Sequence, residues 1–418
     1  MTAAPLPTPG TVVMNFGGSF VEGPERIREV AQLLVAAREE GRRVVGTVSA
    51  TGSTTDSLVG LARRMSPSPD PRELDMLLST SERIACALVA IAVHELGHEA
   101  ISLTGSQAGI LTDAVYTRAR IREIAPVRVL QALDEGKIVL VAGFQGFSRE
   151  TMDVTTLGRG GSAATAVALA AALHASCEIY SDVPGVFTAD PRIVPEARRL
   201  DRVSYEEMLE MSASGARMLM LRAVELARAH DVPILARSSL SKEPCTWVHH
   251  VEEMEQPIVS AVTHSDDIVV FSLSGLPDRP GTAAAVFESL AAENANVDSV
   301  VQNGRHDVAE LSVAAAPEDV PAARLAFERV RAALGPLALE ELPDPATVSL
   351  VGAGMRAHAG VAAKMFRTLA DQGVDIRRVS TSPIRITVTV ARSEVERAVR
   401  SLHAAFGLGE DAAAAAAN

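Results

Sequence analysis

Hydrophobic positions in the first 240 residues follow two alternating spacings. Residues 12–14 and 44–48 are short apolar runs that end in glycine- or serine-containing turns, which predicts buried strands. Residues 25–40 repeat apolar positions as an amphipathic helix does, and further helices are predicted at 75–96 and 162–173. Strands that alternate with helices indicate parallel βαβ units, so the predicted fold class is α/β, a sandwich around a mostly parallel sheet.

The pattern changes near Leu240. Residues 241–256 are polar and have no period, which predicts a linker. Beyond them a glycine turn, a helix and a second turn occur twice between predicted strands, at a spacing of roughly 75 residues, which indicates a repeated βαββαβ unit. The predicted order is a disordered tail (1–10), an α/β domain (11–240), the linker (241–256), two α+β modules (257–340 and 341–410) and a second disordered tail (411–418).

The composition narrows the function classes. A chain of 418 residues, 47% of them apolar, can fill two or three cores. The net charge of −13 disfavours a nucleic-acid surface, which needs a basic footprint. The sequence has three scattered cysteines without a C-x-x-C pair, no signal-peptide pattern and no apolar run long enough to span a bilayer. We therefore expect a cytoplasmic protein without a membrane partner.

Three segments could carry chemistry. The first and third directly follow predicted strands, and ligands of open parallel sheets bind beyond the carboxyl ends of the strands. Asn15–Ser19 holds two glycines that let backbone N–H groups approach phosphate oxygens. Thr155–Ser162 leads into a helix that Ser162 is expected to cap, and Arg159 offers a fork for a carboxylate. Ser181–Arg192 is an acidic loop that could hold ribose, metal or phosphates. Each segment, taken alone, is more often an ordinary turn or a capped helix.

His94–His98 fits the H-E-x-x-H pattern of zinc proteases. Gly97 stands inside the motif at a predicted helix end, and no third ligand is evident downstream. The motif is therefore interpreted as a solvated helix terminus, and no metal site made of protein ligands alone is predicted.

In their order along the chain, these segments resemble the aspartate kinase (aspartokinase) family. The resemblance is to its short form, with an amino-acid-kinase domain and two ACT modules, and it runs from about residue 12 to residue 408. The further motifs that carry it are Ser49–Asp56, Leu78–Arg83, Thr104–Gly109, Val141–Gly146, Ser204–Leu209, Val232–Ile234, Val301–Asn303 and Val379–Ser382.

The resemblance implies ATP-dependent phosphorylation of the aspartate side-chain carboxylate to 4-phospho-aspartate, assisted by Mg²⁺ and regulated through the ACT modules. It implies that Glu82 binds the amino group of the substrate and Arg159 a carboxylate. The substrate site would also contain Ser49, Gly160, Gly161 and Ser162, and the nucleotide site Phe16, Gly17, Gly18, Ser181, Asp182, Phe187, Asp190 and Arg192.

The two ACT modules imply an effector site, because such modules pair and bind amino acids at their interface. Lysine or threonine is the implied effector, and a homodimer or a larger assembly is the implied state. The implied contacts are Asp278, Asn296, Val297 and Gln302 in the first module, with Val374 and Asp375 in the second. Asn296 and Asp375 could instead only cap turns. Pro383 stands where the family usually has Glu, and some relatives start a separate regulatory chain near the position of Met254.

Three catalytic positions depart from the family pattern. Asn15 replaces the lysine that neutralises charge on the transferring phosphoryl group, and Ala163 replaces the acid that orients this lysine. Arg217 replaces a further lysine of the family. An acid without its cationic partner would repel phosphate, so the changes at Asn15 and Ala163 are interpreted as one lost device. A charge ~4 Å from phosphate at an effective dielectric of ~20 is worth about 4 kcal/mol, roughly 10³-fold in rate.

Two interpretations follow from these departures. The first is a slow or re-tuned kinase, in which Arg159, Arg217, Mg²⁺ and backbone amides supply the missing charge. The alternative is a catalytically inactive pseudokinase that senses ligands or regulates a partner, or a specialised paralogue that acts on an aspartate analogue. Because the rest of the pocket motifs are retained, the sequence favours the kinase slightly.

Overall fold

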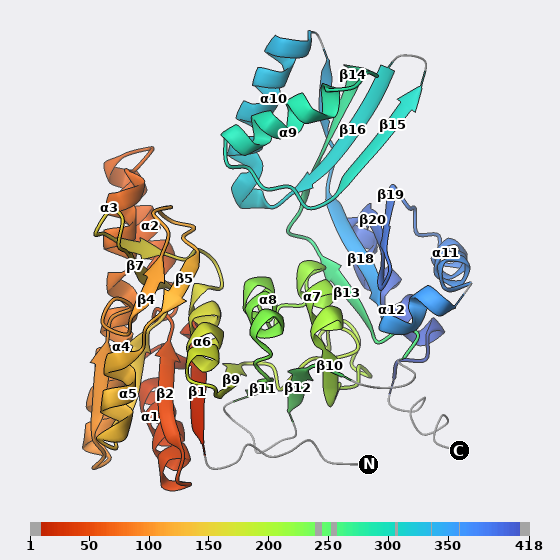
Figure 1. Cartoon of the computed structure of the whole chain (residues 1–418). Helices are drawn as coiled ribbons and strands as arrows, with labels where there is room; N and C mark the ends of the chain where they lie inside the picture. Colours follow the sequence, from red (N-terminus) through yellow and green to blue (C-terminus); the bar gives the residue numbers. More distant parts are fainter. Residues whose placement is uncertain are drawn as a thin grey trace. The chain divides into compact units, whose positions relative to one another are not determined.

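The chain forms two compact units in the computed structural model (Figure 1). The first contains the described residues up to Val186, with 199–212 and 217–251, and the second contains 187–198, 213–216 and the described residues from 257 onward. Residues 1–9, the predicted C-terminal tail and, within the predicted linker, residues 241–244 and 252–256 with Met254 lie outside the described residues. The prediction of a linker is wrong at Thr246–His249, which form a strand of the first unit. The structure describes residues 10–238, 245–251, 257–305, 308–335, 337–358 and 360–409.

The first unit is built on an eight-stranded sheet that confirms the predicted fold class. Its neighbouring strands are parallel except β11 and β12, which pair antiparallel. In sheet order the strands are β10 (Arg202–Ser204), β12 (Thr246–His249), β11 (Ile234–Ser238), β9 (Ser176–Ser181), β1 (Thr11–Phe16), β2 (Arg43–Val48), β6 (Ile138–Ala142) and β3 (Ala100–Leu103).

Helices pack against this sheet through their apolar residues. Helices α1 (Pro24–Glu39) and α4 (Thr80–Glu95) pack on each other and share a buried core with β1 and β2. Helices α6 (Gly161–Ala172) and α8 (Leu221–His230) pack together, and α6 also contacts β1, β2 and β9. Two further helices of this unit are α5 (Val127–Asp134) and α7 (Tyr205–Ala213).

The helix predicted at residues 75–96 is two helices. Helix α3 (Pro71–Leu78) starts earlier, since Asp70 accepts hydrogen bonds from the backbone N–H groups of Arg72 and Glu73, and the chain breaks at Ser79 before α4. By length and composition, Pro71–Glu95 is the one stretch among the described residues that could cross a membrane, but half of its most apolar window is buried inside the protein. The burial of α4 in the core of the first unit accounts for its apolar sequence.

A second, smaller sheet of the first unit is absent from the sequence-based prediction. It contains β5 (Ile121–Ile124), β4 (Ile110–Thr112), β7 (Gln145–Ser148) and β8 (Val154–Thr156), in this order. Strands of three or four residues, such as these, have too little alternation to be recognised in the sequence.

Helix α2 (Thr54–Met65) precedes α3 and has no buried residue.

The second unit contains two antiparallel sheets, each covered by helices, as the repeated βαββαβ pattern predicts. The first sheet, in the order β15 (Val300–Arg305), β16 (Val308–Ala315), β14 (Val269–Pro277) and β17 (Ala338–Glu341), shares a core with α9 (Thr282–Ala292) and α10 (Val320–Leu334). The second, in the order β13 (Ala261–Ser265), β18 (Pro345–Val351), β20 (Arg385–Ala391) and β19 (Arg378–Ser382), shares a core with α11 (Val361–Asp371) and α12 (Val395–Ala405).

The position of β13 differs from the predicted module boundaries. Residues 261–265 fall inside the segment predicted as the first module, yet β13 pairs with β18 of the second sheet from Ala261↔Val351 to Ser265↔Thr347. The pairing crosses about eighty residues of intervening chain, and a single-strand pattern contains no information about such a distant partner. The predicted modules are thus interleaved by one strand.

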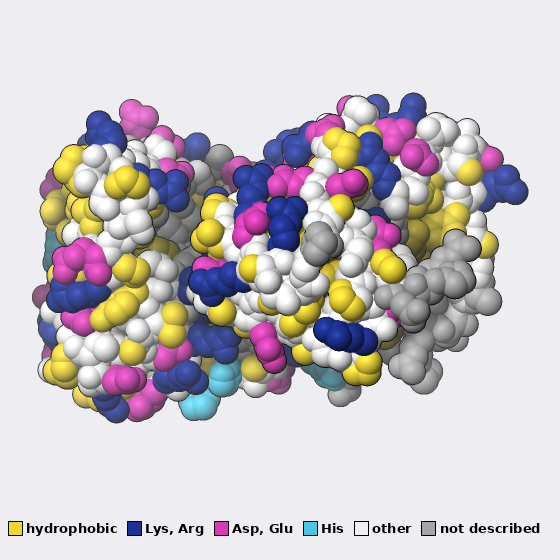
Figure 2. Space-filling model, turned by 90° about the horizontal axis from the view of Figure 1, so that it is seen from above, with side chains coloured by type: hydrophobic (Ala, Val, Ile, Leu, Met, Phe, Trp, Pro, Cys, Tyr) yellow, Lys and Arg dark blue, Asp and Glu magenta, His cyan; other side chains and the backbone are white. Residues whose placement is uncertain are grey.

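Charged side chains of both signs are mixed with apolar ones on the face of the molecule drawn in Figure 2. That face shows no broad basic field of the kind that a nucleic-acid surface requires.

Candidate active site

A cavity of about 560 Å³ opens at the carboxyl ends of the central strands of the first unit. It brings together residues from the three segments singled out in the sequence, although the first lies more than a hundred residues from the other two. The predicted site residues that line it are Asn15, Gly17, Gly18, Ser49, Glu82, Arg159, Gly160, Gly161, Ser162, Ala163, Ser181 and Asp182. Gly18 is needed for the close approach of the turns after β1 and β2, since a Cβ there would lie 2.8 Å from the carbonyl oxygen of Ala50.

Asn15 is held in one orientation at the floor of this cavity. Its side chain is buried, with 4% of the residue exposed. The amide oxygen Oδ1 accepts two hydrogen bonds, one of 2.9 Å from the Ser162 hydroxyl and one of 3.0 Å from the Thr47 hydroxyl. With Oδ1 engaged by both hydroxyls, the amide NH₂ group is the part of Asn15 that can serve a ligand in the cavity.

Helix α6 begins at the same place. Gly160 is the N-cap residue, with a φ of 74° in the left-handed region that favours glycine, and no side chain caps the helix. Ser162 lies inside the first turn and bonds to Asn15, so the expectation that Ser162 caps the helix is wrong. The free N–H groups of this first turn and the helix dipole attract anions.

The charges that line the cavity are unequal. Arg159 is the single arginine or lysine among the described lining residues, and it is exposed. Three acids line the same space, namely Asp56 from α2, Glu82 from α4 and Asp182 after β9. A ligand with both a carboxylate and an ammonium group matches this mixture better than a purely anionic one.

Glu82 is the buried acid of the three, with 3% of the residue exposed. Burial raises the pKa of its carboxyl group to about 7, against smaller opposing effects of hydrogen bonds from backbone groups and from the Ser81 hydroxyl. The Ser81 hydroxyl donates to Oε2 of Glu82 at 2.9 Å. The side chain is therefore poised between its neutral and charged forms near neutral pH, and an ammonium group would favour the charged form.

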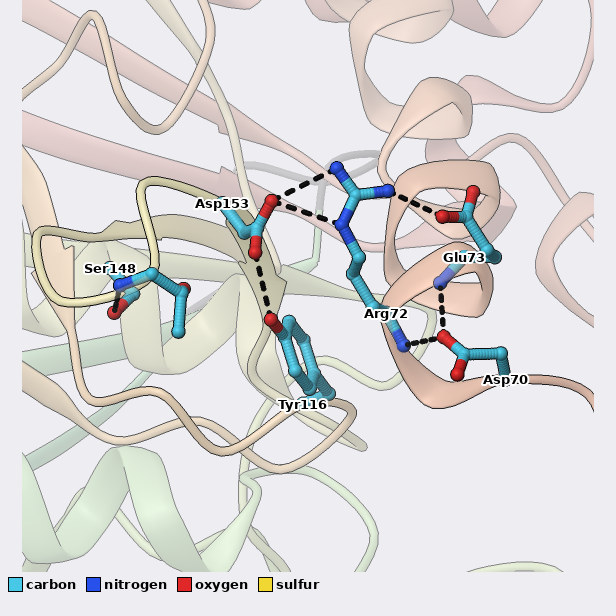
Figure 3. Close-up of polar contacts among 7 residues, drawn as sticks. Asp70, Arg72, Glu73, Tyr116, Ser148 and Asp153 are labelled. Carbon is cyan, nitrogen blue, oxygen red and sulfur yellow. Dashed lines mark hydrogen bonds and ion pairs between the residues drawn. The ribbon is translucent and has the colours of Figure 1, made fainter.

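A polar cluster anchors α3 beside the cavity (Figure 3). Asp153 accepts a hydrogen bond of 3.1 Å from Nε of Arg72 and one of 2.8 Å from the Tyr116 hydroxyl. The Arg72 and Tyr116 contacts hold the pKa of Asp153 below its usual value. The cluster links the first turn of α3 to the turn between β7 and β8 and to the loop after β4.

Asp75 makes a second, buried anchor from the same helix. Its carboxylate accepts hydrogen bonds from the backbone N–H of Thr117, from the backbone N–H of Thr156 and from the Thr156 hydroxyl, at 2.6–3.1 Å. Burial raises its pKa. Since Leu74, Thr117 and Thr156 line the cavity, this carboxylate fixes one wall of the site.

The side chains of the zinc-protease pattern at 94–98 do not form a group of metal ligands. His98 lies 3.5 Å from Glu39 of α1, and Gly97 ends the helix with a φ of 83°. No group of three or more His, Cys, Asp or Glu side chains that could hold a metal occurs within the described part of the chain.

Residues 10–237 match the model of the amino acid kinase family, and residues 348–406 match an ACT domain. The aspartokinase of Mycolicibacterium smegmatis is 50% identical over 96% of this chain and 97% of that protein. This chain belongs to the aspartokinase family. Among solved structures, Escherichia coli aspartokinase III in complex with aspartate and ADP matches 94% of this chain and 99% of that one, with 25% identity and a TM-score of 0.81. The same enzyme with lysine and aspartate matches with 94% and 98% coverage, 25% identity and a TM-score of 0.72.

Membership of the aspartokinase family supports a phosphotransferase with a carboxyl acceptor. Relatives at this level of identity over almost the whole chain are named as kinases, so the alternative of an inactive pseudokinase is not favoured. Asn15 and Ala163, which depart from the family pattern, both line the cavity, and Ala163 contributes a methyl group to it.

Several residues expected at the aspartokinase site do not line the cavity among the described residues. Phe16 is fully buried and stacks on Tyr180 at a centroid distance of 4.8 Å. Phe187, Asp190 and Arg192 belong to the second unit, where Phe187 packs on the core and Arg192 pairs with Asp190 at 2.7 Å. Arg217 directly precedes the lining residue Met218 but does not itself line the cavity.

Sequence reasoning missed other residues that line the cavity. Thr55, Asp56 and Val59 of α2 line it, as do Met218, Leu219 and Met220 before α8. Thr47 acts behind the lining, through Asn15. The Ser49–Asp56 motif already contained Thr55 and Asp56, whereas the apolar run around Thr47 contained no signal of a polar role.

The implied effector residues lie in both ACT modules of the second unit. Asp278 and Gln302 are exposed, and Asp278 lies against β15, since a Cβ on Gly304 would be 2.3 Å from its Oδ2. Asn296 and Asp375 are also exposed. Val297 is partly buried against the core of the first module and Val374 is buried in the core of the second, so a ligand would meet chiefly the backbone of Val374.

Proposed function

We propose that this chain transfers the γ-phosphoryl group of ATP to the side-chain carboxylate of aspartate, forming 4-phospho-aspartate. The observation that supports it most is the cavity at the strand ends, where Arg159, Glu82 and the first turn of α6 face one space. E. coli aspartokinase III, which shares the fold, was solved with aspartate and ADP. We therefore assign the same two ligand classes to the cavity of this chain.

Arg159 and Glu82 would hold the amino-acid end of aspartate. A guanidinium group binds a carboxylate through two parallel hydrogen bonds, so Arg159 would take the α-carboxylate. Glu82, once charged, would pair with the α-ammonium group, and its burial strengthens that pair because water does not screen it. These two contacts leave the side-chain carboxylate of aspartate as the free nucleophile.

The phosphates would meet backbone N–H groups rather than a lysine. Gly17 and Gly18 allow close approach to phosphate oxygens, and the first turn of α6 adds unpaired N–H donors. The Asn15 amide would donate one hydrogen bond to the transferring phosphoryl group. Mg²⁺ usually binds through one or two carboxylates together with substrate phosphates, and Asp182, an exposed acid of the lining beside Ser181, would fit that role. The ion would supply positive charge to the phosphates.

The kinase would be slow or re-tuned because Asn15 supplies a dipole instead of a charge. Phosphoryl transfer depends chiefly on positioning and on electrostatic stabilisation. Arg159 is the one lining cation among the described residues, and by our assignment it is engaged with the substrate carboxylate. The positive charge at the phosphates would therefore come from the metal ion and from backbone dipoles.

The test is a hydroxylamine-trapping assay with the purified full chain, ATP, Mg²⁺ and L-aspartate. We expect aspartyl hydroxamate above the background of a reaction without aspartate. Arg159→Gln should raise the KM for aspartate at least tenfold, whereas the control Arg149→Gln should leave it unchanged because Arg149 is exposed and pairs with Glu123. No hydroxamate from the wild type at high enzyme concentration would contradict the proposal for aspartate.

For regulation and state, we propose lysine or threonine as the effector, a homodimer or larger assembly formed through the ACT modules, and a cytoplasmic location. Lysine is supported by the E. coli enzyme solved with lysine and aspartate. A lysine titration of the trapping assay and light scattering of the full chain test the first two points. Unchanged rates together with a monomer in solution would contradict them.

A further inference from the structure

Helix α8 contacts the short segment between β8 and α6 that carries Arg159. The helix packs beside α6, whose first turn directly follows this segment (Figure 1). Met220, the N-cap residue of α8, lies against Gly160, since a Cβ on that glycine would be 2.8 Å from the Cβ of Met220. Before Arg159, the backbone carbonyl of Leu157 accepts a hydrogen bond of 2.6 Å from Nη1 of Arg222, in the first turn of α8. The start of α8 therefore holds the chain on both sides of Arg159.

Arg222 also binds a second segment of the first unit. Its Nη2 donates a hydrogen bond of 2.8 Å to the backbone carbonyl of Ala119. Ala119 is buried, and its own backbone N–H donates to the carbonyl of Thr156 at 2.9 Å. Because the guanidinium group has its donors in a rigid fork, its two bonds fix the two carbonyls relative to each other. Thr117 and Thr156, close to these bonds in the chain, both line the candidate active site.

Asp75 and Arg222 hold the same two segments through opposite groups. The carboxylate of Asp75 accepts from their backbone N–H groups, whereas the guanidinium of Arg222 donates to their backbone carbonyls. Burial lowers the pKa of Arg222, and Arg120 lowers it further, while Asp113 and Glu225 raise it. The side chain stays charged near neutral pH, since arginine is effectively always protonated. Both of its bonds are therefore charge-assisted.

Arg159 depends on its backbone for its position. Within the part of the chain that the structure describes, no hydrogen bond or ion pair holds its exposed guanidinium group. Gly158 and Gly160 flank it, with φ values of 76° and 74°, and glycine restricts the backbone less than any other residue. Without contacts from outside, such a segment would sample many conformations. The contacts from α8 therefore limit the positions that the guanidinium group can take.

We propose that Arg222 is a positioning residue for the substrate, because it holds the segment of Arg159 in the conformation that binds a carboxylate. Arg222 does not line the candidate active site itself, so it acts through Arg159. Its role rests on the proposed function, in which Arg159 binds the α-carboxylate of aspartate. That contact is made before and during the transfer of the phosphoryl group, so its loss weakens substrate binding and leaves the chemical step nearly unchanged.

Arg222→Gln tests this role in the trapping assay with the full chain, ATP, Mg²⁺ and L-aspartate. We expect the KM for aspartate to rise about tenfold, while kcat and the KM for ATP change by less than about twofold. Arg228→Gln is the matched control and should leave all three constants unchanged. Arg228 lies in the last turn of the same helix, is exposed and does not line the candidate active site. A fall in kcat with an unchanged KM for aspartate in Arg222→Gln would overturn the proposal.

The double variant Arg159→Gln with Arg222→Gln separates positioning from a general structural role. If Arg222 acts through Arg159, its loss should change the KM for aspartate by less than about twofold once Arg159 is already replaced. Two independent effects would multiply instead. A KM that rises by the product of the two single effects would therefore contradict the proposal.

Arg222→Lys guards against a folding defect, which thermal unfolding of each variant checks. A lysine can donate to one of the two carbonyls but lacks the fork, so we expect a KM for aspartate between those of the wild type and Arg222→Gln. If Arg222→Gln does not fold, Arg222→Lys decides in its place. A KM for aspartate raised at least about threefold would support the proposal, and a wild-type KM would exclude it.

Hydrogen exchange gives a readout that does not depend on catalysis. The backbone N–H groups of Leu157 and Gly161, at the two ends of the segment, donate hydrogen bonds of 2.8 Å and 3.0 Å. Both amides should lose protection in Arg222→Gln and keep it in Arg228→Gln, and unchanged protection in Arg222→Gln would show that the side chain does not hold the segment. If the wild type forms no hydroxamate, the proposed function fails, and the exchange experiment still decides whether Arg222 fixes this segment.

Discussion

The Ser162 hydroxyl donates a 2.9 Å hydrogen bond to Oδ1 of Asn15, joining the first turn of α6 to the end of β1. The Thr47 hydroxyl, on the paired strand β2, donates to the same oxygen. Asn15 is neutral where the family has a lysine, but its side chain is held in one orientation. It is oriented by two neighbours so that its NH₂ group remains for the ligand.

Restoring the lost charge should speed the kinase. In Asn15→Lys with Ala163→Asp, the lysine would face the phosphates and the aspartate would orient it from the third position of the first turn of α6. Since a full charge at ~4 Å is worth about 4 kcal/mol at an effective dielectric of ~20, the upper limit is roughly a 10³-fold rise in kcat. The trapping assay measures it.

The single variants are the controls for this pair. Asn15→Lys alone should gain less than the pair, because Ala163 offers no partner to orient the ammonium group. Ala163→Asp alone should lose activity, since it adds a negative charge beside the phosphates. A double variant no faster than the wild type would show that the two changes are not one device.

Thr47 should act as a positioning residue through Asn15. Thr47→Val keeps the shape but removes one of the two donors to Oδ1, so the amide is held by the Ser162 hydroxyl alone and is less firmly oriented. The loss of one hydrogen bond of ~1 kcal/mol predicts a fall in kcat of about fivefold, with an unchanged KM for aspartate. Thr47→Ser restores the hydroxyl and should restore kcat. A fall in stability without a change in kcat for Thr47→Val would mean that Thr47 has only a structural role.

Much of the fold could be predicted because the central strands are buried on both faces. Residues 138–142 are continuously apolar and residues 44–48 are rich in valine, and they appear as β6 and β2 within one residue of the predicted bounds. The strands of the smaller sheet and the partner of β13 could not be found in this way. Both depend on pairings between distant segments, and short strands contain no pattern that specifies a partner.

A similar part of the candidate active site could be predicted from the sequence. Residues directly after strand ends, such as Gly17, Ser49 and Asp182, do meet at one cavity, because parallel strands place their carboxyl ends at one edge. Thr47 could not be found, since its role follows from the cross-strand register that sets it opposite Asn15. Phe187 follows β9 only after a turn, and the chain has by then entered the second unit.

Glu82 should make substrate binding and stability depend on pH in opposite directions. Its pKa is raised from 4.5 to about 7. Aspartate binding needs the charged form, so the KM for aspartate should fall as pH rises through about 7. For the free protein, the protonated form contributes roughly 3 kcal/mol of stability, which is fully present below pH 4.5 and is lost as pH rises through about 7.

Urea unfolding and steady-state kinetics, measured from about pH 5 to about pH 9, would test both trends. This range covers roughly two pH units on either side of neutrality. Glu82→Gln cannot titrate, so it should flatten both profiles and raise the KM for aspartate at high pH. Profiles of the wild type and of Glu82→Gln with the same slope would exclude Glu82 as the titrating group.

Asp75→Asn should destabilise the first unit strongly. Its carboxylate accepts from the backbone N–H groups of Thr117 and Thr156 and from the Thr156 hydroxyl, and the residue is fully buried. An asparagine would turn an NH₂ group toward at least one of these donors. Losing charge-assisted bonds and leaving a buried donor unpaired predicts a fall in the free energy of unfolding of about 3 kcal/mol.

Asp153→Asn is the matched comparison, since Asp153 anchors the same helix α3 through Arg72 and Tyr116 at a more exposed place (Figure 3). Solvent screens this cluster, so we expect a clearly smaller loss than for Asp75→Asn. Hydrogen exchange separates the two effects: the amides of Thr117 and Thr156 should lose protection in Asp75→Asn and keep most of it in Asp153→Asn. Equal losses in both variants would show that the wall of the cavity is held by the whole of α3 rather than by the buried carboxylate.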